Sequence, residues 1–166
     1  MEQHLITNKE IGTLARPVSR NIDDARLIVC IDESEQIDIK PTLGDTLFLD
    51  ILKNDEGKYS ELLAGGQYEK GIFKGLKAVV AYYAYARLIR ISDTNVTRYG
   101  IVSKDDEYST RIGEHERNKQ VADARNVADR YFSECLSYMR YKGFISGCSD
   151  KRVQPQQRIK INIIGD

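Results

Sequence analysis

Side chains that could do chemistry are few in this sequence of 166 residues, and their spacing brings none of them together into a recognisable site. The two histidines are His4 and His115, and His115 stands between Glu114 and Glu116. We expect a helix to start there, and adjacent residues of a helix point in different directions, so these three cannot converge on one metal ion. The pattern therefore favours a solvated helix start over a metal site.

Motifs for other reactions are missing as well. The acidic run 105–107 lacks the spaced oxygen ligands and the turn glycine of a calcium loop. No serine stands in a nucleophile elbow, and there is no G-x-x-x-x-G-K phosphate loop. Gly65, Gly66 and Gly71 do not follow a predicted strand, so we interpret them as a hinge rather than as a dinucleotide-binding loop. We expect the chain not to be an enzyme and to hold no cofactor and no metal.

Composition places the chain among ordinary globular proteins of one domain, with 41% hydrophobic and 30% charged residues. Residues 1–10 lack the basic and apolar regions of a signal peptide. Cys30, Cys135 and Cys148 have no metal-ligand or redox spacing, and such a scattered set fits a reducing cytoplasm. Cys30 and Cys135 fall on apolar helix faces, where a cysteine acts as a small hydrophobe.

The strongest structural signal is the apolar segment that follows the three glycines. No charge occurs between Lys77 and Arg87, a run of nine residues. We predict a long helix at about 70–91, enclosed by other helices or by neighbouring subunits, because a helix apolar on all sides is normally buried. The three tyrosines within it are interpreted as packing residues rather than as a stacking platform for bases. The apolar run is far shorter than the roughly 20 residues of a membrane span, so no membrane contact is expected.

Shorter helices are predicted before this central one. A capping-box pattern at Thr7 and Glu10 opens a helix that ends before Pro17. Further helices are expected at about 23–36 and 42–54, with a brief extended link at 37–41 and a helical turn at 59–64. The last helix, at about 114–142, has a stripe with steps of three and four residues, which marks one buried face: Val121, Ala124, Ala128, Tyr131, Phe132, Cys135, Leu136 and Met139.

Residues 92–113 break the helical pattern and are interpreted as a projecting loop, with a small hairpin across Val96–Tyr99 and Ile101–Ser103. A connection of this length is either disordered or functional. In the functional case it contacts a neighbouring component or a channel, since arginine and tyrosine are favoured at interfaces. The candidate partner-binding residues of this loop are Arg98, Tyr99 and Lys104.

The C-terminal stretch differs in kind from the helical body. Residues 150–158 read as a linker, and the isoleucines that follow alternate with polar residues, which is the period of a strand with one apolar face. Such a strand either adds to another chain or pairs with residues 96–103 of its own. We therefore divide the chain into a helical domain, 1–149, and an extended C-terminal arm, 150–166. The arm's candidate partner-binding residues are Arg152, Arg158, Ile159, Lys160, Ile161 and Ile163.

Charge is unevenly distributed along this chain of zero net charge. Residues 1–70 hold 8 basic and 14 acidic residues, whereas residues 71–166 hold 17 basic and 11 acidic ones. This split reflects either solvated helix faces or an interface that joins an acidic face of one copy to a basic face of another. A dedicated duplex-DNA binder would show a basic excess.

The order of these parts resembles a family. An Ile22-Asp23-Asp24 helix start is followed by Lys40-Pro41-Thr42-Leu43-Gly44 and Leu63-Ala64-Gly65-Gly66, and then by Ala81-Tyr82-Tyr83-Ala84-Tyr85 and Thr97-Arg98-Tyr99-Gly100. Together these are similar to the head–tail connector, or adaptor, proteins of tailed bacteriophages, including those of Bacteroides and crAss-like phages. The resemblance covers most of residues 5–142.

The resemblance implies a structural virion protein at the head–tail junction, assembled in the host cytoplasm. Such proteins form a ring, typically of twelve copies, below the portal protein. The ring continues the DNA channel, through which DNA passes without sequence-specific binding, and it offers a docking surface to the next tail or stopper protein.

We accordingly predict a mainly α fold, a bundle of about four to five helices with a long central helix, a projecting loop or small hairpin, and an extended C-terminal arm. The alternative function is a small helical regulatory or nucleic-acid-binding module. That alternative needs a basic recognition helix, and the basic residues of the helix at 114–142 are interleaved with acidic ones.

Overall fold

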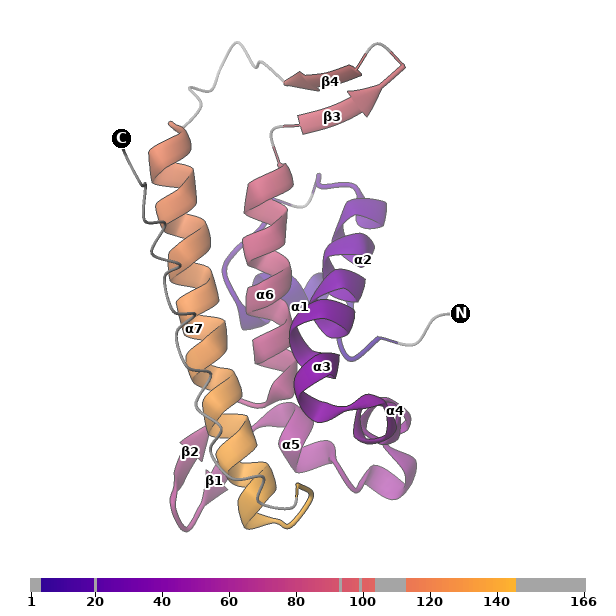
Figure 1. Ribbon diagram of the computed structural model, residues 1–166, viewed down its shortest axis with the longest axis vertical. Coiled ribbons are helices and arrows are strands. Elements are labelled where there is room, and N and C mark those ends of the chain that lie inside the picture. Colours follow the sequence, from indigo (N-terminus) through magenta and orange to yellow (C-terminus); the bar gives the residue numbers. More distant parts are fainter. Residues whose placement is uncertain (1–3, 20, 93, 99, 104–112, 146–166) are drawn as a thin grey trace, which may run out of the picture.

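The computed structural model describes residues 4–19, 21–92, 94–98, 100–103 and 113–145, and these form a mainly helical bundle (Figure 1). The predicted mainly α fold with a long central helix is confirmed. Within the described residues the α-helices are α1 (Asn8–Leu14), α2 (Asp24–Glu33), α3 (Lys40–Leu43), α4 (Asp45–Lys53), α5 (Ser60–Ala64), α6 (Leu76–Ile91) and α7 (Glu114–Tyr141). A π-helix, η1 (Ser34–Ile39), and a 3₁₀ turn, η2 (Asp55–Gly57), link some of them.

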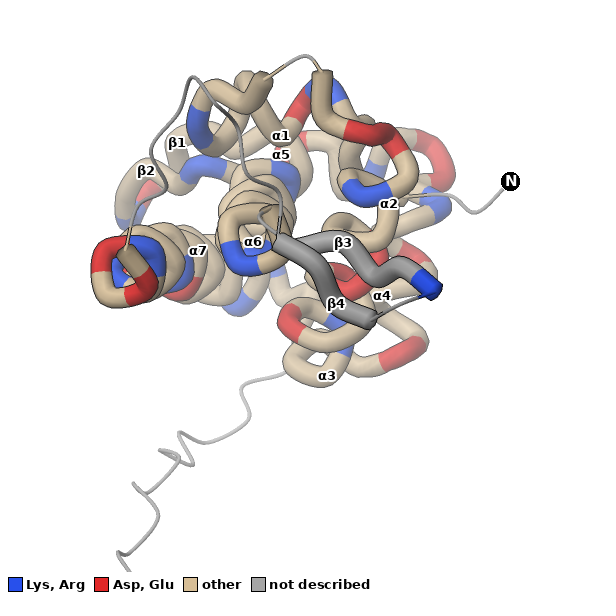
Figure 2. Tube along the Cα trace, turned by 90° about the horizontal axis from the view of Figure 1, so that it is seen from above, with Lys and Arg blue, Asp and Glu red and all other residues tan. Residues whose placement is uncertain are grey.

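Helix α6 is the buried axis of the bundle, as its uncharged sequence predicts. It packs against α7 on one side and against α2 and η1 on the other, and it also contacts α1 and α5. Seen along the bundle, α6 lies between α7 and the group formed by α2, α3 and α4 (Figure 2). Its buried residues are Leu76, Ala78, Val79, Val80, Ala81, Tyr83, Ala84, Ala86 and Leu88.

Helix α7 presents its apolar stripe to α6, and its bounds agree with the predicted 114–142 to within one residue. Small side chains at Ala124 and Ala128 allow close approach in the upper half of the contact, and larger ones fill the lower half. There the rings of Phe73 and Tyr138 stack with centroids 4.2 Å apart. Tyr68 packs edge-on against both rings.

The predicted start of the central helix at about 70 is wrong. Residues 66–73 instead form an antiparallel hairpin of β1 (Gly66–Tyr68) and β2 (Gly71–Phe73), and α6 begins only at Leu76. Gly65 and Gly75 flank this hairpin with φ values of +86° and +85°, and their backbones touch: a Cβ on Gly75 would lie 2.4 Å from the Gly65 nitrogen. The glycines therefore allow the chain segments before and after the hairpin to cross in close contact. A hinge would not require such a close approach.

The predicted extended link at 37–41 is also wrong, because the chain stays helical through it. Helix α2 continues into the π-helix η1, and α3 follows directly at Lys40. Ile39 is fully buried in the core. The wide π-helical turn directs its side chain inward, whereas an α-helical turn would direct that side chain elsewhere. Pro41 is accommodated in the first turn of α3, where the missing N–H costs nothing.

The other predicted helices are present with altered bounds. The 23–36 helix corresponds to α2 and the start of η1, and the 42–54 helix corresponds to the end of α3 and to α4. Gly44, with φ +81°, separates these two. In α1 the predicted capping box is present, with Oε2 of Glu10 accepting a 2.7 Å hydrogen bond from the backbone N–H of Thr7.

The predicted hairpin in the 92–113 segment is confirmed, and its register is shifted from the predicted one. β3 (Thr94–Thr97) pairs antiparallel with β4 (Gly100–Ser103), and the pair projects from the end of α6 (Figure 1). The arm predicted at 150–166 lies outside the described residues, and so does the choice between its two proposed strand partners. The division of the chain at residue 149 stays a prediction.

Candidate protein-interaction surfaces

The one fully buried carboxylate among the described residues, Glu35, has a structural environment. Its Oε1 accepts a 2.7 Å hydrogen bond from the backbone N–H of Leu5, and its Oε2 lies 3.0 Å from Nδ1 of His4. Burial raises the pKa of Glu35, and the two hydrogen bonds from the N-terminal segment oppose that rise. Both oxygens are thus engaged in holding the segment before α1 on the π-helix.

Arg87 plays a similar role at the middle of α6. Its guanidinium donates to Oε2 of Glu33 at 3.1 Å and to Oδ2 of Asp38 at 2.7 Å, so that it joins α6 to α2 and η1. The side chain is mostly buried, and a paired, buried arginine of this kind fixes geometry. The arrangement stabilises the contact of α6 with α2 and η1.

Two tyrosine hydroxyls tie α7 to its neighbours. Tyr83 of α6 donates to Oδ1 of Asp129, and Tyr138 of α7 donates to Oε2 of Glu61 at 2.5 Å. Burial, together with these carboxylates, raises the pKa of both phenols, so neither is available as a base. The tyrosines of the central helix pack in the bundle as predicted: Tyr82, for instance, meets Tyr131 edge-on with centroids 5.6 Å apart.

No three His, Cys, Asp or Glu side chains of the described residues are placed to hold a metal ion. His115 is exposed in the first turn of α7, beside Glu114 and Glu116. Within the part of the chain that the structure describes, no helix is both long and apolar enough to cross a membrane.

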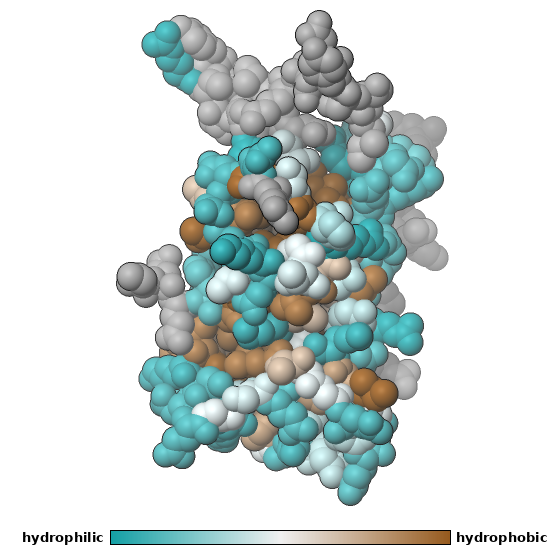
Figure 3. All heavy atoms as spheres, turned by 180° about the vertical axis from the view of Figure 1, so that it is seen from behind, coloured by the Kyte–Doolittle hydropathy of each residue, from teal (hydrophilic) through white to brown (hydrophobic). Residues whose placement is uncertain are grey.

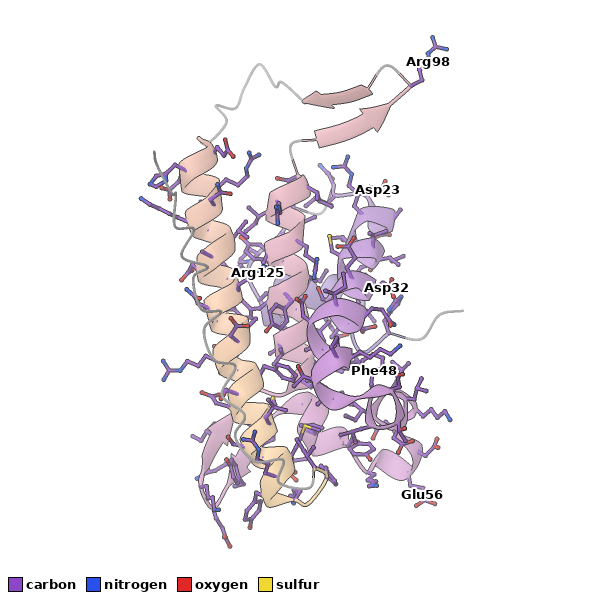
Figure 4. All side chains as sticks on the ribbon, viewed as in Figure 1. Asp23, Asp32, Phe48, Glu56, Arg98 and Arg125 are labelled. Atoms are coloured by element: carbon purple, nitrogen blue, oxygen red, sulfur yellow. The ribbon has the colours of Figure 1, made fainter. Side chains whose placement is uncertain are left out.

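Of the predicted partner-binding residues, Arg98 alone is among the described ones. It lies between β3 and β4, at the tip of the hairpin, and its side chain points away from the helical body (Figure 4). The other residues predicted to bind partners lie outside the described residues: Tyr99, Lys104, Arg152, Arg158, Ile159, Lys160, Ile161 and Ile163. Their contacts stay predictions.

An acidic flank covers the side of the molecule opposite α7. Residues 23–58, which run from α2 through η2, contain ten acidic and four basic residues. Asp23, Asp32 and Glu56 follow one another down this side (Figure 4). The acidic excess of the first half of the sequence is therefore gathered on one flank of the fold.

Apolar side chains stand exposed on the same flank. Ile37 of η1 is 58% exposed and Val29 of α2 is 52% exposed, and Ile28 and Leu49 are also exposed. On the rear face, by contrast, apolar side chains appear in small areas interrupted by polar ones (Figure 3). Sequence analysis missed the exposure of Ile37 because it assigned 37–41 to an extended link.

A groove lies on the other flank, between β2 and α7. It has a volume of about 420 Å³, and Ile72, at 69% exposure, stands on its β2 side. Lys74 and Arg130 bring two cations to its lining, against one carboxylate from Glu134. Little in the sequence indicates this hairpin, because the two residues between β1 and β2, Glu69 and Lys70, are not one of the glycine or asparagine pairs that mark a hairpin turn.

A second groove, of about 510 Å³, lies at the end of the molecule opposite the β3–β4 hairpin. It is lined by the start of α4, by Lys58 and Tyr59, and by residues 143–145, which follow α7. Nζ of Lys58 lies 4.9 Å from the centre of the Tyr59 ring. This groove borders the point from which the C-terminal residues continue.

The outer face of α7 does not carry the basic excess that a nucleic-acid-binding helix needs. Lys119 lies 3.9 Å from Glu116, and Arg130 lies 3.8 Å from Glu134. Asp123 is paired with Arg16 of the loop after α1. Helix α7 holds five basic and five acidic residues, and this lack of a basic excess weakens the alternative of a nucleic-acid-binding module.

Comparison with characterised proteins and with solved structures finds no match to this chain. A family model described as a family of unknown function, DUF6712, matches residues 39–144. The matched region begins at the end of η1 and continues through α7, so it includes the central helix, both hairpins and the β2–α7 groove. Since it spans more than half of the sequence, the chain belongs to the DUF6712 family.

Proposed function

We propose that this protein is a structural subunit of a phage head–tail connector: a ring, below the portal protein, that joins head to tail and continues the DNA channel. The sequence resemblance described above motivates the proposal. Its structural support is the placement of two contact segments at opposite ends of one elongated body. The β3–β4 hairpin leaves one end, and residue 145, from which the arm continues, lies near the other (Figure 1).

The distance between those ends suits an axial connector. Helix α7 has 28 residues, which at 1.5 Å per residue corresponds to about 42 Å. It packs along α6 over much of that length, so the separation of the two segments is set by a rigid helix pair. A subunit built this way contacts one component with its hairpin and another with its arm, and it contributes its long axis to the channel wall.

The remaining parts of the proposal concern partners and location. The partners are sister subunits, the portal protein and a downstream tail or stopper protein, and the location is the virion. We propose no catalytic activity and no cofactor. DNA passes through without sequence-specific contacts.

Cryo-electron microscopy of purified phage particles that contain this chain tests the proposal directly. We expect cyclic density at the head–tail vertex into which the α6–α7 pair fits with its long axis along the channel. Mass spectrometry of particles and of empty heads supplies the control, because a connector is retained in the former after washing in high salt. Absence of the chain from purified particles, or its presence only in the capsid shell, would refute the proposed function.

A further inference from the structure

We propose that copies of this chain associate side by side through a head-to-tail contact, in which the acidic flank of one copy packs against the β2–α7 groove of the next. The inference rests on the proposed ring and names the two surfaces that close it. The part of the acidic flank that enters the contact is a ridge formed by Val29, Asp32 and Ile37.

The ridge has the chemistry of an interface core with a charged border. Leu27, Cys30 and Ile31 of α2 face the core, so Val29 and Asp32 lie on its outward side. Ile37 extends this side one π-helical turn further on. More than half of each of the two apolar side chains is exposed to solvent, and covering them with a partner would remove that apolar area from water.

The groove offers the complementary chemistry. Ile72 is the most exposed large apolar side chain of the described residues, and half-buried Val127 and Tyr131 continue the apolar lining. Lys74 and Arg130 stand beside them, and since Arg130 already lies 3.8 Å from Glu134, Lys74 is the cation that the groove offers to Asp32. An apolar centre bordered by charges is the usual composition of a protein–protein contact, and opposite charges fix its register.

The positions of the two surfaces decide the symmetry of the contact. The β2–α7 groove and the acidic ridge lie on opposite sides of α6 (Figures 1 and 2). A two-fold dimer uses the same patch on both copies, whereas a contact between two different patches repeats and closes into a ring when the rotation allows. The fold therefore favours a ring over a two-fold dimer.

Site-directed cross-linking tests this contact in the full-length protein. One variant carries Ile72→Cys and another carries Ile37→Cys, both with Cys148→Ser, and the two are mixed and treated with a short bismaleimide. Burial raises the pKa of Cys30 to about 11 and that of Cys135 to about 12, so these native thiols stay protonated and unreactive at neutral pH. We expect a covalent dimer in the mixture and little product from either variant alone.

A control variant carries Thr13→Cys, an exposed position of α1 on neither surface. The inference is overturned if the mixture of Ile72→Cys and Ile37→Cys gives no more mixed dimer than a mixture with the control variant. It is also overturned if Ile72→Cys alone gives the dominant product, because that product indicates a two-fold contact. Both cross-linking results are obtained with the isolated protein at its highest soluble concentration, in the absence of phage particles. Absence of the chain from virions, by contrast, refutes the connector function and leaves the contact standing.

Charge reversal provides a second, independent measurement. We expect Lys74→Glu to reduce the cross-linking yield several-fold, because it places a carboxylate against Asp32 of the neighbour. Combining it with Asp32→Lys on the neighbour should restore the yield. Failure of this pair to restore what Lys74→Glu removes contradicts the proposed register, and circular dichroism of both variants verifies that they fold.

Discussion

The backbone N–H of Leu5 donates a hydrogen bond of 2.7 Å to Oε1 of Glu35, which joins the start of the chain to the π-helix. Nδ1 of His4 lies 3.0 Å from the other carboxylate oxygen. The contact holds Leu5 and Ile6 in the core, where both are buried. The π-helix, which could not be predicted from the sequence, thus places the carboxylate of Glu35 inside the fold, where it holds the N-terminal segment.

We expect Glu35→Ala to lower the free energy of unfolding by about 1–3 kcal/mol, because it leaves the buried N–H of Leu5 without an acceptor. Glu35→Gln keeps an acceptor oxygen at nearly the same place and should cost less. Urea denaturation followed by circular dichroism measures both changes. Equal losses for the two variants would show that the hydrogen bond contributes nothing.

The wild-type protein and Glu35→Gln should differ in how their stability depends on pH. Burial holds the pKa of Glu35 above its ordinary 4.5, so the folded state binds more protons than the unfolded state between these two pKa values. The stability that the protonated carboxyl provides is therefore present below about pH 4.5 and is lost as the pH rises through the folded-state pKa. Glu35→Gln has no such proton to lose, and its stability curve should be flatter over this interval. An unchanged curve would contradict the raised pKa.

Gly65→Ala should destabilise the protein by more than about 2 kcal/mol, because φ at this position is +86° and the new Cβ would lie 2.5 Å from the backbone carbon of Lys74. Gly113→Ala is the matched control. It has an ordinary φ of −62° and open space around its Cβ position, so its cost comes only from the weaker N-cap that alanine gives α7 and should stay below about 1 kcal/mol. Thermal unfolding of the two variants compares them.

Helix α7 and the segment 37–41 show what can and what cannot be predicted from the sequence. Helix α7 was predicted nearly to the residue because its stripe repeats over 28 residues and every repeat supports the same face. The segment 37–41 was wrongly predicted to be an extended link, since Ile37 and Ile39 alternate with polar residues over too short a run to separate the period of a helix from that of an extended chain. In the fold only Ile39 is buried, and tertiary packing keeps the segment helical.

The interaction surfaces were harder to predict for a related reason. The charge split was visible in the sequence, but it became a surface only when the fold gathered residues 23–58 on one flank. The groove at Ile72 depends on the crossing of Gly65 and Gly75, a contact between backbones that no local pattern encodes. Arg98 was chosen from local sequence alone, and although the fold places it at the tip of the hairpin, its role in binding stays a prediction.

Deletion of residues 152–166 should leave the helical body folded, because the last described residues that pack on the core, Met139, Phe144 and Ile145, all precede the deletion. The same deletion should prevent incorporation into particles if the arm binds the portal or a sister subunit through a sheet edge. Ile161→Asp should do nearly as much, since it places a charge in an apolar pocket. Asn162→Asp adds the same charge on the other face of the alternation and should be tolerated. Docking of the truncated protein with unchanged affinity would show that the arm is dispensable.

Arg98→Ala should weaken docking of the hairpin end roughly tenfold, the size of a moderate interface residue. Lys53→Ala, an exposed change on α4, should have no such effect. Limited proteolysis within residues 92–113 should be slower in assembled particles than in free protein. Equal cleavage in both states would mean that the hairpin contacts no partner.

The length of α7 has a consequence for the DNA that the proposed ring would surround. About 42 Å of helix corresponds to roughly twelve base pairs of B-form duplex at 3.4 Å each, which is slightly more than one helical turn. Over a full turn the channel wall meets the major and the minor groove once at every angle, so the groove pattern averages out around the axis. A subunit of this height would thus present the duplex with a nearly uniform cylinder, and passage would be equally easy at any rotational setting of the duplex.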